Sequence, residues 1–288
     1  MLRNRLRLPQ LARPKPNSAP AGLAERIWAL DNLRQAWRRV RANVLAVARP
    51  MIQGKLLNQR LVLQRRIEGV DEGGQSLALA PAAAPAVQKA AQGIGRLLDP
   101  ATRASTLDTL RGYEGKAGAF YFGALRQLLP AELGFQGRAF YPPPDPANAA
   151  LSFGYTYLRG AVEGAVQTVG LDPYLGFFHT PHHNQPALAL DLMEEFRPLV
   201  VDVIVLRAFG QRVLTAADFR TAGPKCWLEG PAARDRFTAL YEERLNTPVT
   251  YHLTGQQNTY RNCILLQAQH LARVIAGEDK VYQPLTMR

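Results

Sequence analysis

The stretch "PPPDPANAALSFGYTYLRGAVEGAV", residues 142–166, contains both a start signal for an α-helix and the spacing that continues one. Asp145 can accept a hydrogen bond from a backbone N–H of the first turn, and Pro146 suits the first helical position. A polar stripe follows at steps of four, three and four residues: Asn148, Ser152, Tyr155 and Arg159. We therefore expect a helix over about 146–169, with a stripe that is either a hydrogen-bonded helix interface or the wall of a site.

Helical periodicity continues on both sides of this stretch, so the predicted fold class is mainly α. The further expected helices cover about 51–66, 86–98, 103–129, 187–209, 231–246 and 253–276. Pro50 is expected to end or restart a helix. Strand character is confined to "KCWLEG" (225–230) and "VTYHLT" (249–254), which we expect to form a short hairpin.

Positive charge is concentrated in the first quarter of the chain. Residues 1–66 hold 15 Lys and Arg but only 2 acidic residues, a net charge of +13 against +12 for the whole chain. Residues 1–22 contain four prolines, and 23–44 have an apolar stripe opposite a basic face, which indicates a basic, partly disordered helical arm. Such an arm favours nucleic acid through phosphate contacts, although a merely solvated leader is the alternative.

We expect three parts in the chain: a basic arm over 1–43, a basic helix and linker over 44–85, and a helical domain over 86–288. The two cysteines have no CxxC spacing, which excludes a cysteine-built zinc site and fits a reducing compartment. The longest apolar run, 198–209, is about twelve residues long, too short to span a bilayer. With no recognisable secretory signal, we expect a cytoplasmic protein without a membrane partner.

The stretch "HTPHHNQPALALDLMEEFRP", residues 179–198, is rich in potential metal ligands. A zinc site made by His179, His182 and His183 is weakly supported, because no HExxH motif accompanies these histidines. Three carboxylates lie at helical steps of three and four, on neighbouring parts of one face, with a basic residue close behind: Asp191, Glu194, Glu195 and Arg197. The plainer interpretation is a loop with exposed histidines that leads into an amphipathic helix with a salt-bridged surface.

A second informative stretch is "LRGYEGKAGAFYFGAL", residues 110–125, where Glu114 lies at the start of an apolar helical run. A carboxylate on the wall of an apolar helix is costly to bury unless it is paired or bound to a cation. The alternative is an exposed first-turn glutamate that the helix dipole favours. These residues alone leave both interpretations open.

Several motifs in this order resemble the CRISPR-associated integrase–nuclease family, the catalytic component that inserts new spacers into CRISPR arrays. The matching strings are "LRGYEGKAGAFYF", "PPPDPANAALSFGYTYL", "GLDPYLGFFH", "LALDLMEEFRPLVVD" and the late "YRNCILLQAQHLARVIAG…VYQPL". The resemblance runs from about residue 44 to the end of the chain. It implies a helical catalytic lobe that acts on double-stranded and branched DNA, with a small ferredoxin-like partner protein and a homodimer.

The resemblance also implies roles for individual residues. The metal ligands would be Glu114, His179 and Glu194, with Asp191 as a supporting acid. On the DNA side, Arg197 would approach a phosphate, and Tyr155 with Asn148 would shape the site. Two carboxylates and one imidazole suit Mg²⁺ or Mn²⁺, which would act on the phosphodiester as a Lewis acid. The attacking group would be the 3′-hydroxyl of the incoming DNA, or water.

The first residues depart from the family pattern. Family members normally begin with a β-rich domain that forms the homodimer, but residues 1–70 lack the alternation of strands, so we expect this domain to be missing or replaced. Residues 1–43 instead look like the opening of a group II intron-type reverse transcriptase, although no YxDD string occurs in the chain. Two hypotheses follow: an active integrase–nuclease, or a catalytically impaired DNA-binding remnant or scaffold of the same family.

Overall fold

The computed structural model describes residues 44–70, 74, 76–77, 79–180 and 185–287. The predicted arm over 1–43, together with His182 and His183, lies outside these residues. The described chain confirms the mainly helical fold. Its helices are α2 (Val44–Glu68), α3 (Ala84–Thr102), α4 (Leu107–Leu128), α5 (Pro146–Thr168), α6 (Ala187–Met193), α7 (Val203–Gly210), α8 (Gly230–Leu245) and α9 (Tyr260–Ala276). None of the helices in this part of the chain is long and apolar enough to cross a membrane.

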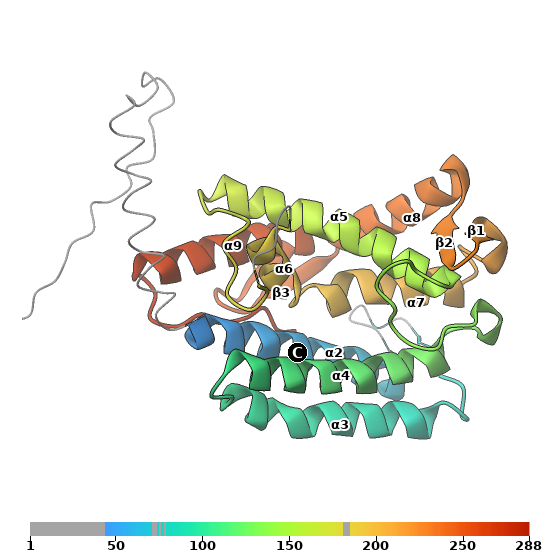
Figure 1. The fold of residues 1–288 in the computed structure, drawn as a ribbon, viewed down its shortest axis with the longest axis horizontal. Helices are drawn as coiled ribbons and strands as arrows, with labels where there is room; N and C mark the ends of the chain where they lie inside the picture. The colour runs from blue at the N-terminus through green and yellow to red at the C-terminus, as the bar shows by residue number, and fades with distance from the viewer. Residues whose placement is uncertain (1–43, 71–73, 75, 78, 181–184, 288) are drawn as a thin grey trace, which may run out of the picture.

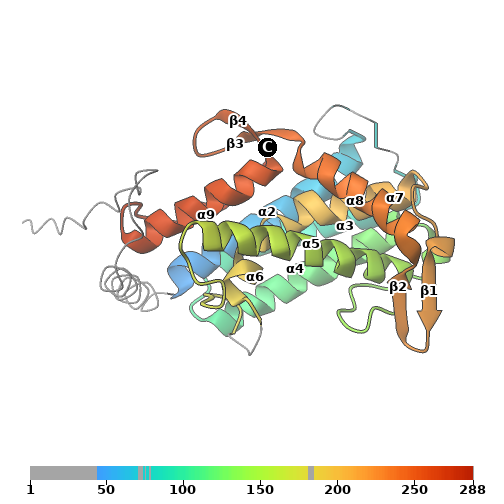
Figure 2. The same ribbon diagram turned by 90° about the horizontal axis from the view of Figure 1, so that it is seen from above.

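The helices form two layers (Figures 1 and 2). Helices α2, α3 and α4 pack on one another as the first layer, and α5, α8 and α9 form the second. The segment 187–210, which contains α6, a π-helical turn at Pro198–Asp202 and α7, packs against both α2 and α5. This connecting segment therefore lies where the two layers meet.

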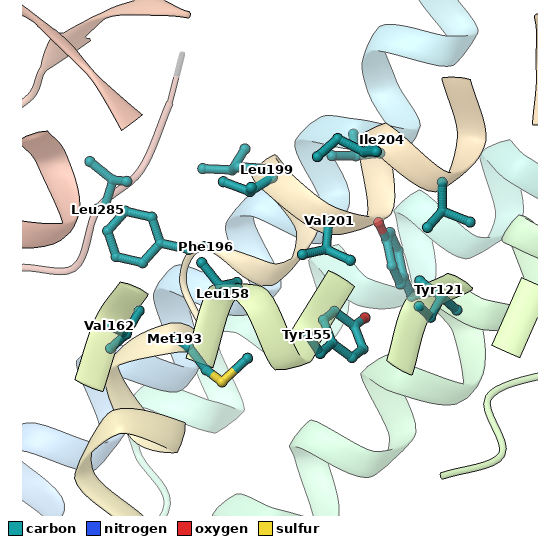
Figure 3. Close-up of a cluster of buried hydrophobic side chains, with 14 of the residues drawn as sticks. Tyr121, Tyr155, Leu158, Val162, Met193, Phe196, Leu199, Val201, Ile204 and Leu285 are labelled. Carbon is teal, nitrogen blue, oxygen red and sulfur yellow. The ribbon is translucent and has the colours of Figure 1, made fainter. Parts of the chain in front are cut away.

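Apolar side chains from both layers and from the C-terminal tail, residues 277–287, form the core at this junction (Figure 3). Leu158 and Val162 of α5 face Met193 and Phe196 of the connecting segment, and all four are at most 1% exposed. Leu285 of the tail is also fully buried there. At about 1.5–3 kcal/mol for each fully buried large side chain, this cluster fixes how the two layers sit together.

The start of α5 follows its sequence signals. The side chain of Asp145 accepts a hydrogen bond from the backbone N–H of Asn148, and Pro146 takes the first helical position. The helix ends at Thr168, one residue before the expected end. The cap and the periodicity therefore predict both ends of α5 to within one residue.

Pro50 does not end a helix, contrary to the expectation. It lies inside α2, which continues to Glu68. Proline removes one backbone hydrogen bond to the carbonyl four residues earlier, that of Ala46, but Ala46 is exposed, so water can satisfy its carbonyl. The neighbouring Met51 and Ile52 are fully buried, and their packing outweighs the local penalty.

The expected single helix over 187–209 is interrupted. Pro198 has no N–H to continue the helical ladder, and the carbonyl of Glu195 accepts a hydrogen bond from the Asn58 side chain at 2.8 Å. The chain passes instead through the π-helical turn Pro198–Asp202, a feature that often marks functional sites. The interruption begins at Glu194, directly after α6 ends at Met193.

The two strand-like segments do not pair with each other, so the expected hairpin between them is wrong. Each pairs with its sequence neighbour: β1 (Phe219–Ala222) with β2 (Lys225–Leu228), and β3 (Pro248–Tyr251) with β4 (Gln256–Thr259). The connecting turns contain Gly223 and Gly255, whose φ angles of 56° and 68° favour glycine. Thr259 then caps α9, which begins at Tyr260 rather than near 253.

Candidate active site

A pocket of about 280 Å³ opens where the first layer meets the connecting segment and α5. Its charged wall consists of Lys55 from α2, Glu114 from α4, Arg138, His179, and Glu194, Arg197 and Asp202 from the connecting segment. Three of the sequence-predicted residues, Glu114, His179 and Glu194, thus come from three separate parts of the chain to one pocket. Tyr155 and Arg197 line it as well.

His179 is oriented by the carboxylate of Asp191. Asp191 is fully buried and accepts hydrogen bonds from the backbone N–H groups of Phe177, Phe178 and His179 at 2.5, 2.9 and 2.8 Å. Its Oδ1 also lies 2.6 Å from Nδ1 of His179. A carboxylate at Nδ1 favours a proton there, which leaves the lone pair on Nε2, 3.6 Å from Oε1 of Glu194.

Gly176 allows this close approach. A Cβ atom at this position would lie 2.7 Å from Cβ of Ala187 and 2.9 Å from Oδ2 of Asp191. Both distances are shorter than side chains tolerate, so only glycine lets the loop before His179 close against α6. Close packing against α6 therefore explains why glycine occupies position 176, the second glycine of the "GLDPYLGFFH" string.

Glu114 and Glu194 face each other across the ammonium group of Lys55. Nζ of Lys55 lies 2.5 Å from Oε1 of Glu114 and 2.6 Å from Oε2 of Glu194. Burial opposes the charge on Lys55, but the carboxylates of Glu194 and Glu114 outweigh it and raise the pKa of the ammonium. Burial would also raise the pKa of Glu194, but the positive charges of Arg197 and Lys55 hold this pKa at about 2. The Lys55 ammonium and the Glu194 carboxylate are therefore both ionised at neutral pH.

Arg197 links Glu194 to the aromatic wall of the pocket. Its guanidinium lies 3.3 Å from Oε1 of Glu194 and 4.8 Å from the centre of the Tyr155 ring. The Tyr155 hydroxyl donates a hydrogen bond of 2.6 Å to Asp202, and burial raises the pKa of Asp202 to about 6. These contacts fix a cationic group and an aromatic ring beside the carboxylates.

Asn148, unlike Tyr155 and Arg197, does not line the pocket. It is fully buried, and its amide donates to the Gly137 carbonyl at 2.9 Å and to Asp145 at 2.7 Å. Its Oδ1 accepts hydrogen bonds from Nη1 of Arg138 at 3.0 Å and from the Ala139 backbone N–H. Asn148 thus holds the loop that places Arg138 in the pocket and presents no exposed atom to DNA.

The plainer interpretations of the acidic residues in these stretches are contradicted, whereas the predicted exposure of His182 and His183 lies outside the described residues. Glu114 is not a first-turn residue, because α4 begins at Leu107 and the Glu114 side chain is only 25% exposed. Asp191, Glu194 and Glu195 do not form a salt-bridged surface, because none is more than 3% exposed. Glu195 accepts hydrogen bonds from the Tyr282 hydroxyl, the Gln267 amide and the Leu285 backbone N–H, and so anchors the C-terminal tail.

Sequence reasoning missed Lys55, Arg138 and Asp202. A signal for Lys55 existed: it occupies a position in the buried stripe of α2, beside Met51, Ile52 and Leu56. A lysine at an apolar stripe position requires an acidic partner, because an unpaired buried ammonium is costly. Arg138 had no such signal, because it lies in a loop outside any periodic pattern.

The donor set fits a hard divalent cation. Nε2 of His179 lies 3.6 Å from Oε1 of Glu194, and Oε2 of Glu194 is buried with no hydrogen-bond donor apart from its ion pair with Lys55. As they lie, no three of the described His, Cys, Asp and Glu side chains come close enough to hold a metal ion. A cation already lies between the two carboxylates, namely the Lys55 ammonium, which shows that the position suits positive charge.

The fold defines the class of protein first. A casposase bound to an integration product superimposes with a TM-score of 0.73 at 23% identity, covering 88% of this chain and 67% of that one. The CAS1 protein from Thermotoga maritima gives a TM-score of 0.70 at 22% identity, covering 88% of this chain and 73% of that one. The chain therefore has the fold shared by casposase and CAS1 structures.

Sequence comparison then identifies the family. Residues 30–243 match the model of the family described as CRISPR associated protein Cas1, and the chain belongs to this family. It is 36% identical over 280 residues to the CRISPR-associated endonuclease Cas1 3 of Thermus thermophilus, covering 96% of this chain and 75% of that protein. It is 37% identical to a Cas4 exonuclease/Cas1 endonuclease fusion of Rhodospirillum rubrum, covering 93% of this chain but 43% of the fusion. The predicted family is thereby confirmed.

Proposed function

We propose that this chain is a metal-dependent DNA nuclease and integrase that inserts spacer DNA into CRISPR arrays in the cytoplasm. Relatives named as Cas1 endonucleases and the similar fold of a casposase bound to an integration product support a role in cutting and joining DNA. The observation that carries the proposal is the convergence of Glu114, His179 and Glu194 on one pocket with basic walls. Such a pocket suits an anionic phosphodiester.

The residues have separable roles in this reaction. Glu114, His179 and Glu194 would hold Mg²⁺ or Mn²⁺, and the ion would supply Lewis-acid polarisation of the scissile phosphate and stabilise the departing oxygen. Asp191 keeps the proton of His179 on Nδ1, so that Nε2 remains available as a ligand. The reaction would be an in-line attack on phosphorus by the 3′-hydroxyl of incoming DNA, or by water. The new P–O bond replaces the bond to the 3′-oxygen of the cut strand, which leaves as a hydroxyl after taking up the proton that the attacking group loses.

Arg138 and Arg197 are the groups that would contact the phosphate. Both line the pocket, and each lies against the Tyr155 ring, at 5.3 and 4.8 Å from its centre. A stacked guanidinium keeps its donors in a fixed direction, and Arg binds phosphate oxygens with two donors at once. Tyr155 therefore contacts both cations in one pocket, where their charge would stabilise the additional negative charge of the transition state.

The proposed partners are double-stranded and branched DNA and a small ferredoxin-like adaptation protein. A solved Cas6-RT-Cas1–Cas2 complex has a similar fold over 85% of this chain, with a TM-score of 0.71, and supports assembly with a second protein. The chain corresponds to 25% of that larger protein. A homodimer, typical of the family, belongs to the same proposal.

The test is strand transfer and cleavage of branched DNA in Mn²⁺ by the purified protein and by Glu114→Ala and His179→Ala variants. We expect activity in the parent and loss in both variants, while Glu132→Ala, an exposed glutamate remote in sequence, keeps it. Activity that survives both site substitutions would contradict the residue assignment. A parent that binds DNA without cutting or joining it would favour the scaffold hypothesis instead.

A further inference from the structure

We propose that Lys55 is an internal counter-ion that occupies the cation position between Glu114 and Glu194 and leaves it when a divalent metal ion binds. The inference rests on the proposed function, because it concerns the metal site of that reaction. It assigns a positioning role to a residue of α2, which the sequence motifs do not include.

The geometry allows only one cation at this position. Nζ of Lys55 lies 2.5 Å from one Glu114 oxygen and 2.6 Å from one Glu194 oxygen, and the Lys55 side chain is only 10% exposed. A divalent ion coordinated by the same oxygens would lie about 2.0–2.2 Å from each. Two cations cannot share that space, so metal binding requires the ammonium group to move.

Lys55 is the group that joins the two carboxylates. Arg197 reaches Glu194 on its other oxygen, Oε1, at 3.3 Å, and among the described residues only Lys55 pairs with both glutamates. Without a cation between them, two ionised carboxylates in a partly buried site repel each other. The ammonium therefore keeps Glu114 and Glu194 on either side of one cation position before the metal arrives.

The displaced ammonium has a place to go. Lys55 itself lines the pocket, and its four-carbon stem lets the charged end move into a space of about 280 Å³. Arg138 and Arg197 line the same space, so a DNA phosphate there would meet three cations rather than two. A phosphate that attracts the Lys55 ammonium draws it away from the position between the carboxylates and so leaves that position open to the metal ion. DNA and metal therefore favour each other's binding through this side chain.

The experiment measures Mn²⁺ binding directly, by the electron paramagnetic resonance signal of free Mn²⁺, in the parent chain and in Lys55→Met and Lys55→Gln variants. Because the competitor is gone, we expect both variants to bind Mn²⁺ more tightly, by about 5- to 150-fold, the usual range of coupling between sites. Lys116→Met, an exposed lysine of α4, is the matched control and should bind as the parent does. Circular dichroism checks that each variant is folded.

A second titration includes a short branched DNA whose own Mn²⁺ binding is measured separately and subtracted. DNA should raise the Mn²⁺ affinity of the parent and leave that of Lys55→Met nearly unchanged. Equal or weaker Mn²⁺ binding by the folded Lys55 variants overturns the inference while leaving the proposed function intact. Absence of Mn²⁺ binding in the parent and all variants, or binding that survives Glu114→Ala, overturns the metal site itself and with it both proposals.

Discussion

Substituting Asn58 by alanine tests a buried link between α2, the connecting segment and the C-terminal tail. Asn58 is fully buried, and its amide donates to the carbonyls of Glu195 and Leu285, both at 2.8 Å. Alanine removes both donors and leaves two buried carbonyl oxygens without these bonds. Each buried acceptor left unsatisfied costs about 1–3 kcal/mol, so the direct sum is about 2–6 kcal/mol.

Release of the tail limits this cost. If the tail separates, water reaches the Leu285 carbonyl, while that of Glu195 stays within the core. We therefore expect Asn58→Ala to lower the free energy of unfolding by about 2–4 kcal/mol. The tail has a built-in reporter, because Tyr282 is only 1% exposed and chymotrypsin cleaves after tyrosine. The variant should lose stability in urea and become cleavable after Tyr282 under native conditions.

Asn246→Ala is the matched control. Its side-chain amide donates to the Glu242 carbonyl at 2.9 Å, a bond of the same kind, but the contact is exposed to water. We expect a loss of at most about 1 kcal/mol, because solvent replaces the bond. Asn58 does not hold the tail if Asn58→Ala costs no more stability than Asn246→Ala and Tyr282 stays protected from the protease.

Two further predictions concern packing and pH. Gly154→Ala places a Cβ 2.6 Å from Cγ1 of Val201 and should destabilise the protein by about 1–3 kcal/mol, whereas Gly164→Ala on the same helix meets nothing within 4 Å and should stabilise it by about 0.5–1 kcal/mol. Urea denaturation of both variants measures the two changes in the free energy of unfolding, and changes of the same sign would contradict the predicted clash at Gly154. Burial lowers the pKa of His270 despite its bond to Asp279, so the unfolded chain binds its proton more readily, and the stability from neutral His270 is lost as pH falls below about 6.5. Urea titrations at pH 8 and 5.5 should show this loss in the parent and less of it in His270→Gln; an equal loss in both would assign the pH dependence to other groups.

Local signals predicted the helices whose ends depend on local chemistry. The Asp145 cap and Pro146 located the start of α5, and the stripe behind them proved to be both interface and wall: Asn148 and Ser152 hold Arg138, while Tyr155 lines the pocket. Helix breaks set by distant residues were not predictable. Pro50 remains helical because its neighbours are buried in a core made by other segments. The carbonyl of Glu195, just before the π-helical turn, bonds to the Asn58 side chain from 137 residues earlier.

In the site, too, the residues of the motifs were predicted, whereas contacts between distant segments were not. Motif resemblance predicted Glu114, His179 and Glu194 as one group, and the structure places all three on one pocket. It did not predict Lys55, because an ion pair depends on two helices that meet only in the folded chain. The buried state of Glu195 was missed for the same reason, since its partners Gln267, Tyr282 and Leu285 lie 72 to 90 residues further along the chain.

The pocket lies at the junction of the two layers, so its candidate metal ligands come from two parts of the fold. Asp191 and Glu194 lie one turn apart on the connecting segment, and Asp191 holds His179, so the relative placement of His179 and Glu194 is set within one piece of backbone. Glu114 and Lys55 belong to the first layer. A small sliding of one layer over the other would therefore change the gap between Glu114 and Glu194 while leaving the relative placement of His179 and Glu194 intact. Substitutions far from the pocket that shift one layer relative to the other would therefore change the distance between Glu114 and Glu194.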